Sequence, residues 1–418
     1  MFASIYLDGA SVAVFIARIT AVDDALDTIT VSLTAKSGTA PTDGATGRTI
    51  KVGGAWKGPN GAEIFPFGFV QSTMMNSSND VLRVNFKNGV TYSYTASLAH
   101  ANSGPTVFQG YTTSAGDLGK ATFDGGTSAI VLVNLTGVAL EIADIIAQNN
   151  GTTGTNSAFT LSAISTVARR CVANTVRGTG FNLGSATAIE CEAYACNSSN
   201  TASSGGFFAF SNVCSFIRCI SHDNVGSNNN GFYQSNATAY FSDCIADSNG
   251  LYGFFLNGRA QSVIMLNCDS YNNGGDGVRS DVATSAGGFH LIENTNLIKN
   301  GGYGINDVET SLGHLVRVIN CGFGAGTQAN TSGQTTGLED FGSEEGSVTY
   351  ANDVTPWVDP ANGDFRINLA AAKNAGRGAF TQTAASYAGA IGYPDIGAVQ
   401  HQDAVPLINS RRNQMIGR

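Results

Sequence analysis

The segment Cys219-Ile-Ser-His-Asp-Asn224, followed by Gly231-Phe232, decides the fold because it recurs along the chain. It returns as Cys244-Ile-Ala-Asp-Ser-Asn249 with Gly253-Phe254, and as Cys268-Asp-Ser-Tyr-Asn-Asn273 with Gly277-Val278. From Ile145 to Cys321 the steps between equivalent positions are 26, 20, 28, 25, 24, 27 and 26 residues. A period in this range predicts a solenoid in which each repeat forms one coil.

Composition excludes several classes of protein. Of the 418 residues, 13% are charged, 42% are hydrophobic and 52 are glycine, which disfavours both helical and disordered chains. The net charge is -9 with no basic stripe, so nucleic-acid binding is not expected. The chain contains no apolar run long enough to predict a membrane span. Its first residues lack the basic segment with which a signal peptide starts, so no signal peptide is expected.

The alternation of strand side chains assigns a side to each position of the repeat. With the cysteine inward, the asparagine falls at a turn, where it can form a ladder of side-chain amides, and the Phe after the glycine fills the core. Six of the eight cysteines hold the same repeat position, so a column of buried free thiols is expected rather than disulfides. No C-x-x-C pair or tandem nonapeptide occurs, so we expect no metal and no cofactor.

Four regions are expected along the chain. Residues 1–85 lack the repeat and are interpreted as an N-terminal cap or attachment region. Residues 86–345 are expected to form the solenoid, residues 346–400 a C-terminal cap, and residues 401–418 a polar tail. Some cap is needed because an open solenoid end exposes core and strand edge.

Two segments carry a family resemblance. Short strands separated by glycine turns begin at Val84-Asn-Phe-Lys-Asn-Gly-Val-Thr-Tyr92, and Tyr393-Pro-Asp-Ile-Gly-Ala-Val-Gln400 is similar to the closing segment of many β-helix proteins. The chain resembles the right-handed parallel β-helix (pectate-lyase-like) superfamily, including phage tailspikes and bacterial β-helix repeat proteins. The resemblance implies an all-β fold: a right-handed parallel β-helix with N-terminal and C-terminal caps. No catalytic motif of polygalacturonases, pectate lyases or alginate epimerases is found, so it transfers no catalytic residue.

Candidate catalytic residues lie at the outward positions beside the cysteines. One outward column contains Tyr194, His222, Asp247 and Tyr271, with Asp243 and Asp269 nearby. Glycoside hydrolysis requires two carboxylates, and Asp247 with Asp269 or Asp243 could supply them. Lyase chemistry would instead need a base and a cation for a uronate. The alternative is an ordinary polar surface, and the alternating charges of Arg170, Glu190, Arg218 and Asp243 predict cross-coil ion pairs.

An aromatic row is expected on a second outward face. Phe208, Tyr233 and Phe255 follow the Gly-apolar step on consecutive repeats. Exposed aromatic rings stack on sugars, and contiguous apolar area marks interfaces, so this row is either a glycan platform or a subunit interface. With Tyr194 and Tyr271, these three residues are the predicted substrate-binding side chains.

The first functional hypothesis is a bacteriophage virion protein: a tailspike, fibre or capsid appendage that engages host surface polysaccharide. As in the phage spikes that the chain resembles, it would form a homotrimer and contact other virion proteins through its N-terminal region. The alternatives are a secreted, extracellular polysaccharide lyase or glycoside hydrolase and a purely architectural solenoid. Whether the protein is an enzyme is left open by the sequence.

Overall fold

A computed structural model describes residues 82–373, apart from residues 90, 95–96, 101–105, 114–116, 138–139, 152, 201–203, 258–260, 282–287, 309–314, 325–330, 334–340, 346 and 352–353, and also describes residues 396–399. Before residue 82 it describes the backbone of five strands only. These strands form a separate sheet in the order β3-β2-β1-β5, with β4 paired to β2. Their bounds are β1 (Phe2–Leu7), β2 (Ala13–Asp23), β3 (Thr28–Val31), β4 (Ser37–Gly38) and β5 (Arg48–Val52).

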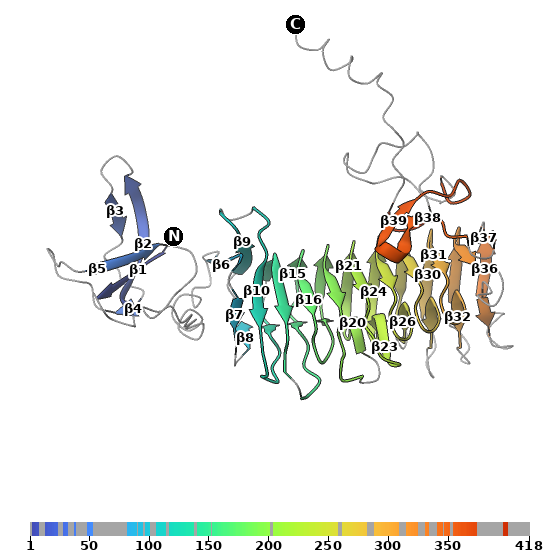
Figure 1. The fold of residues 1–418 in the computed structure, drawn as a ribbon, viewed down its shortest axis with the longest axis horizontal. Coiled ribbons are helices and arrows are strands. Elements are labelled where there is room, and N and C mark those ends of the chain that lie inside the picture. The colour runs from blue at the N-terminus through green and yellow to red at the C-terminus, as the bar shows by residue number, and fades with distance from the viewer. Residues whose placement is uncertain are drawn as a thin grey trace, which may run out of the picture.

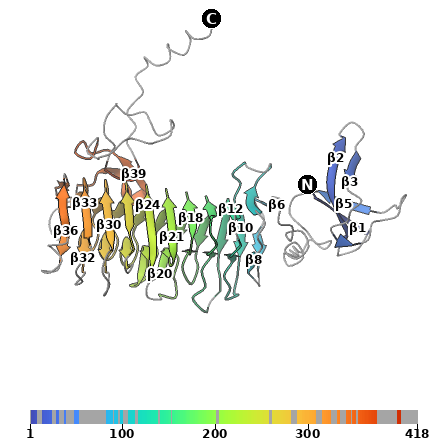
Figure 2. The same ribbon diagram turned by 180° about the vertical axis from the view of Figure 1, so that it is seen from behind.

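The main body is a parallel β-helix, which confirms the predicted all-β fold (Figures 1 and 2). Each coil gives one strand to each of three sheets with 11, 11 and 10 strands. The first sheet contains β6 (Leu82–Lys87), β9 (Thr106–Tyr111), β12 (Leu140–Ala143), β15 (Thr166–Arg169), β18 (Ala186–Ile189), β21 (Asn212–Ile217), β24 (Ala237–Ser242), β27 (Val263–Leu266), β30 (Phe289–Glu293), β33 (Leu315–Ile319) and β36 (Phe341–Glu345).

The second sheet also has 11 strands. It contains β7 (Thr91–Ser93), β10 (Ala121–Asp124), β13 (Ile145–Gln148), β16 (Val172–Asn174), β19 (Glu192–Tyr194), β22 (Ile220–His222), β25 (Ile245–Asp247), β28 (Asp269–Tyr271), β31 (Asn296–Ile298), β34 (Gly322–Gly324) and β37 (Val348–Tyr350). The third sheet contains β8 (Leu98–His100), β11 (Val133–Leu135), β14 (Phe159–Leu161), β17 (Phe181–Leu183), β20 (Ser204–Ala209), β23 (Asn229–Gln234), β26 (Phe254–Leu256), β29 (Val278–Ser280), β32 (Ile305–Asp307) and β35 (Thr331–Gly333).

A left-handed residue turns each coil from the first sheet into the second. The residue directly before the cysteine position has positive φ on successive coils, for example 51° at Arg218 and 56° at Asp243. This conformation is uncommon for residues other than glycine and redirects the chain sharply. The following cysteine then points inward, and the described cysteines are all free and buried, as expected.

Stacked phenylalanine rings fill the core beside the third sheet. Successive ring centroids are 4.5, 4.8, 4.9 and 4.8 Å apart, with the planes within 2 to 8° of parallel, along Phe159, Phe181, Phe207, Phe232 and Phe254. These side chains have no exposed surface. Their contribution is structural, as the repeat predicts.

The predicted asparagine ladder is present and buried. The Nδ2 atom of Asn224 donates to Oδ1 of Asn249 at 2.7 Å, Asn249 donates to Asn273 at 2.8 Å, and Asn273 donates to Asn300 at 2.9 Å. The same amides also bond the turn backbone: Asn249 donates to the Ser221 carbonyl at 3.0 Å. Each amide therefore joins a turn to its neighbouring coil.

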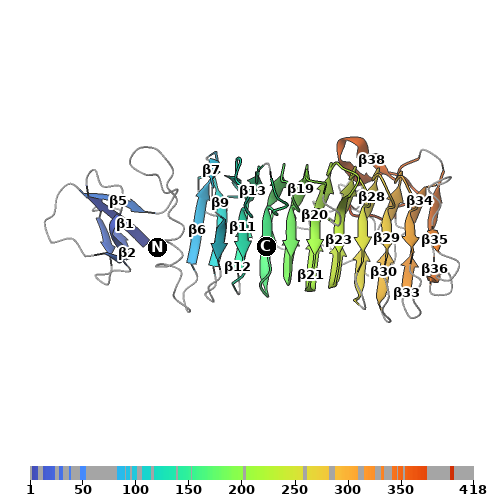
Figure 3. The same ribbon diagram turned by 90° about the horizontal axis from the view of Figure 1, so that it is seen from below.

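The described residues of the C-terminal segment pack against the outer face of the second sheet. That residues 346–400 cap the solenoid stays a prediction. The segment contains β38 (Trp357–Asp359), the 3₁₀ turn η2 (Pro360–Asn362) and β39 (Asp364–Ile367), and β38 pairs antiparallel with β39. Trp357, Phe365 and Ile367 form an apolar cluster with Ile245, Tyr271 and Ile298. Figures 1 and 3 show this hairpin on one flank near the C-terminal coils.

The described part of the chain contains no helix with the length and apolarity needed to cross a membrane.

We expect Asn249→Ala to reduce the free energy of unfolding by about 2–4 kcal/mol, because it leaves buried partners of the ladder unsatisfied. Urea unfolding followed by circular dichroism measures the loss. The control is Asn236→Ala, which removes an exposed amide bonded to Ser235 Oγ and should change stability by less than about 0.5 kcal/mol. Equal effects of the two variants would show that the ladder contributes nothing specific.

Candidate functional site

One outward column of the second sheet forms a continuous line of polar side chains. The strand register places these residues opposite one another on six successive coils. We call this line the polar row: Asp124, Gln148, Asn174, Tyr194, His222 and Asp247. Because each residue occupies the same position of its strand, neighbouring members are separated by one coil spacing of about 4.8 Å.

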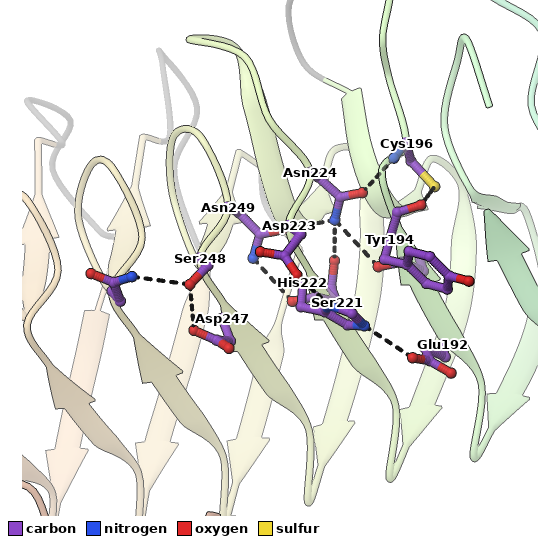
Figure 4. Close-up of polar contacts among 12 residues, drawn as sticks. Glu192, Tyr194, Cys196, Ser221, His222, Asp223, Asn224, Asp247, Ser248 and Asn249 are labelled. Atoms are coloured by element: carbon purple, nitrogen blue, oxygen red, sulfur yellow. Dashed lines mark hydrogen bonds and ion pairs between the residues drawn. The ribbon is translucent and has the colours of Figure 1, made fainter. Parts of the chain in front are cut away.

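His222 lies at the centre of a cluster of ionisable side chains (Figure 4). Its Nε2 atom is 2.9 Å from Oε1 of Glu192, and its Nδ1 atom is 2.9 Å from Oδ2 of Asp223. Burial lowers the pKa of His222, but the hydrogen bonds to the two carboxylates raise it above its ordinary value overall. The bond to His222 lowers the pKa of Glu192. The Tyr194 ring stacks on the imidazole at 5.1 Å, so one face of the imidazole and both its nitrogens have partners.

Asp247 opposes His222 on the next coil. Burial raises the pKa of Asp247 to about 6, and the charge of Asp223 adds to this increase, although a bond from Ser248 opposes it. The site therefore contains two carboxyl groups whose pKa values are shifted in opposite directions, upwards for Asp247 and downwards for Glu192. Asp223 was missed by the sequence analysis, because it is not in the outward column but at the left-handed turn after it, with φ of 50°.

Asp243 does not join this cluster. It is the left-handed corner residue before Cys244, and its side chain bonds Ser242 and Asn267. Burial raises its pKa. It precedes β25 (Ile245–Asp247) by two residues, at the corner of the coil. The pairing of Asp243 with Asp247 stays a prediction.

The expectation that Asp269 and Tyr271 face solvent is wrong. Both point out of the coil, but the C-terminal segment covers them, leaving Asp269 0% and Tyr271 8% exposed. Asp269 accepts hydrogen bonds from the Asn296 amide at 3.0 Å and from the backbone N–H of Ala398 at 2.9 Å. Burial outweighs these bonds and raises its pKa to about 7. Asp269 therefore anchors the segment and does not meet a substrate.

The aromatic row forms a stack instead of a platform. Phe208, Tyr233 and Phe255 lie face to face, with centroids 4.8 and 5.1 Å apart. Tyr233 is only 6% exposed, so the expectation that it is exposed is wrong. Sugar rings bind to free aromatic faces, and here the faces within the stack are occupied by neighbouring rings. The roles of Phe208 and Phe255 at the two ends of the stack stay predictions.

The predicted ion pairs between coils are present in a different order. Arg218 pairs with Glu190 at 2.8 Å, as expected, but Arg170 pairs with the buried Asp144 at 2.7 Å rather than with Glu190. Both pairs join corner residues of adjacent coils, so they stabilise the scaffold at the edge of the second sheet. Among the described residues, no group of three or more His, Cys, Asp or Glu side chains is arranged to hold a metal ion.

No protein-family model matches the chain, and no curated protein sequence matches it significantly. Similar solved structures include pectate lyase Pel9A, at 16% identity over 84% of this chain and 96% of that chain, with a TM-score of 0.49. The A-module of mannuronan C-5 epimerase AlgE4 from Azotobacter vinelandii is 14% identical, covering 59% of this chain and 70% of that chain, with a TM-score of 0.46. A pectin methylesterase from Aspergillus niger is 14% identical, covering 71% and 83%, with a TM-score of 0.28. These likenesses assign no residue of the site.

Asp269 makes the stability of the protein depend on pH. Its raised pKa means that the folded state holds a proton that the unfolded state has released, so stability from this group falls as pH rises between about 4 and 7. We expect the stability difference between wild type and Asp269→Asn to shift by about 2 kcal/mol between pH 5 and pH 8. Urea unfolding of both proteins at both pH values measures it. A difference independent of pH would show that Asp269 keeps an ordinary pKa.

Proposed function

We propose that the polar row binds a polysaccharide and that Asp247 and Asp223 hydrolyse its glycosidic bond. The observation that carries this proposal is the raised pKa of Asp247, about 6, to which the charge of neighbouring Asp223 contributes. A carboxyl group with a raised pKa beside a second carboxyl group is the usual arrangement for glycoside hydrolysis.

The register supports the proposed pair. Asp223 follows His222 by one residue, and Asp247 opposes His222 on the next coil, so the two backbones are roughly 6 Å apart. This backbone separation is compatible with the spacing of about 5–9.5 Å between the carboxyl groups of glycosidases. Figure 4 shows Asp223, His222 and Asp247 on the same face of the sheet.

Each group has a defined role in the proposed reaction. Protonated Asp247 donates its proton to the glycosidic oxygen as the bond from this oxygen to the anomeric carbon breaks. The Asp223 carboxylate removes a proton from the water that attacks the anomeric carbon, so the products are a hemiacetal and an alcohol. His222 is a positioning residue: its Nδ1–H holds the Asp223 carboxylate, while Glu192 fixes the other ring nitrogen.

The charges of this face favour hydrolysis over elimination from a uronate. Elimination needs a cation to neutralise the uronate carboxylate. Among the described residues lining β10 to β25, Arg170 and Arg218 are paired with carboxylates, and Lys120 lies close enough to lower the pKa of Glu192. The carboxylates next to the polar row, Glu192 and Asp223, both contact His222, so we propose that a neutral or amino-bearing glycan suits this face better than an acidic one.

The proposed chemistry predicts a specific pH dependence. Because Asp247 must be protonated, kcat/KM should fall about tenfold per pH unit above pH 6. Asp247→Asn should lower kcat by about 10²–10⁴-fold, whereas Asp243→Asn, the matched control outside the pair, should leave it unchanged. Release of reducing ends from a panel of neutral, amino-bearing and acidic polysaccharides provides the measurement. If no polysaccharide is cleaved, or if Asp247→Asn retains full activity, the proposal fails.

The virion hypothesis uses the same face, since a phage spike that binds host polysaccharide could also cleave it. Its distinguishing expectations are a homotrimer and attachment through the N-terminal region, which stay predictions. Light scattering tests the first: a trimer at micromolar concentration supports a phage appendage. A monomer under the same conditions would favour a secreted hydrolase.

A further inference from the structure

The polar row ends abruptly at Asp247. The next position in register is Tyr271, and the one after it is Ile298. Tyr271 is 8% exposed and Ile298 is 1% exposed, because the β38–β39 hairpin lies over them. The Tyr271 ring contacts Trp357 edge-on at 5.4 Å and Phe365 at 6.1 Å. A substrate chain that follows the row cannot continue along the sheet past this hairpin.

Buried polar bonds fix residues 396–399 to the sheet, and the hairpin contacts these residues. Asn296 donates to the carbonyl of Ile396 at 2.7 Å, and Asp269 accepts from the backbone N–H of Ala398. Val399 forms an isolated β-bridge with Arg366 of β39, and the hairpin itself is held by its apolar cluster with the sheet. Buried polar groups with several hydrogen-bond partners keep a single arrangement, because breaking any of these bonds leaves a buried polar atom without a partner, which is unfavourable. The hairpin therefore forms a fixed wall.

On the other side of Asp247 the row continues over five further coils, from His222 to Asp124. The five coil spacings from Asp247 to Asp124 amount to about 24 Å, enough for several sugar units. Its side chains are polar or aromatic with a hydrogen-bonding group, and Asp124, Gln148 and Asn149 are linked by bonds of 2.8 and 2.9 Å. The row is thus long on one side of the proposed acid and blocked on the other.

We infer that this protein cleaves its glycan from a chain end, because the hairpin leaves space beyond Asp247 for a short product only. The inference rests on the proposed hydrolysis and assigns the hairpin, through Trp357 and Phe365, as the element that limits product length. The rest of the chain lies along the row from His222 towards Asp124, while the end of the glycan abuts the wall. The bond protonated by Asp247 is then one or two sugar units from that end.

The length of the first products tests this inference. Wild-type protein should release only mono- or disaccharides from the earliest time points, with little early loss of solution viscosity. A glycan whose chain ends are blocked chemically should be cleaved at least tenfold more slowly. Chromatography of the products at low conversion and viscometry provide both readouts. Mixed long oligosaccharides at low conversion, or equal cleavage of the blocked glycan, would overturn the inference while leaving the hydrolysis itself supported.

Variants of the hairpin give an independent test. Trp357→Ala removes a large side chain of the hairpin and should shift the products towards longer oligosaccharides, with a faster loss of solution viscosity. Val358→Ala is the matched control, because Val358 lies on the same strand and is 47% exposed, so products should stay short. Circular dichroism establishes that each variant is folded. A folded Trp357→Ala protein with unchanged short products would contradict the role of the hairpin, whereas absence of cleavage by wild type would refute the proposed function itself.

Discussion

In-register hydrogen bonding between successive coils is the constraint on which the rest of this structure depends. Parallel strands such as β19, β22, β25 and β28 pair residue for residue without a shift. Equivalent side chains therefore stack at one coil spacing, about 4.8 Å. At this spacing phenylalanine rings stack and amides form a ladder. A side chain that cannot pack against or hydrogen-bond to its equivalents on the two adjacent coils lowers the stability of the fold.

The same constraint creates the proposed site. Coils of this kind bring ionisable groups closer than an ordinary surface would, because a single register position on adjacent coils contains Tyr194, His222 and Asp247. His222 is held between Glu192 and Asp223, while Asp247 retains its proton to a higher pH than an ordinary aspartate. The raised pKa values of His222 and Asp247 thus follow from the stacking of coils together with partial burial.

The C-terminal hairpin then covers one part of the outer face of the second sheet. Over β28 and β31 it converts outward positions into a second apolar core, in which Tyr271, Trp357 and Phe365 pack edge to face. Over β10 to β25 the outward position that defines the polar row stays polar, from Asp124 to Asp247, although Ile245 of β25 joins the apolar cluster. A segment remote in sequence therefore decides on which of several equivalent coils this outward position is covered.

The sequence by itself determined the solenoid, the inward cysteines, the asparagine ladder and the phenylalanine column, because each follows from a short period and strand alternation. It also identified His222 and Asp247, which occupy an outward column. Only the tertiary structure decided that Asp223 joins them, since a left-handed turn directs it there, and that Asp269, Tyr271 and Tyr233 are covered. Periodicity predicts whether a residue points into or out of the coil. Whether an outward residue is buried depends on distant segments and neighbouring rings that pack over it, and no local pattern encodes these contacts.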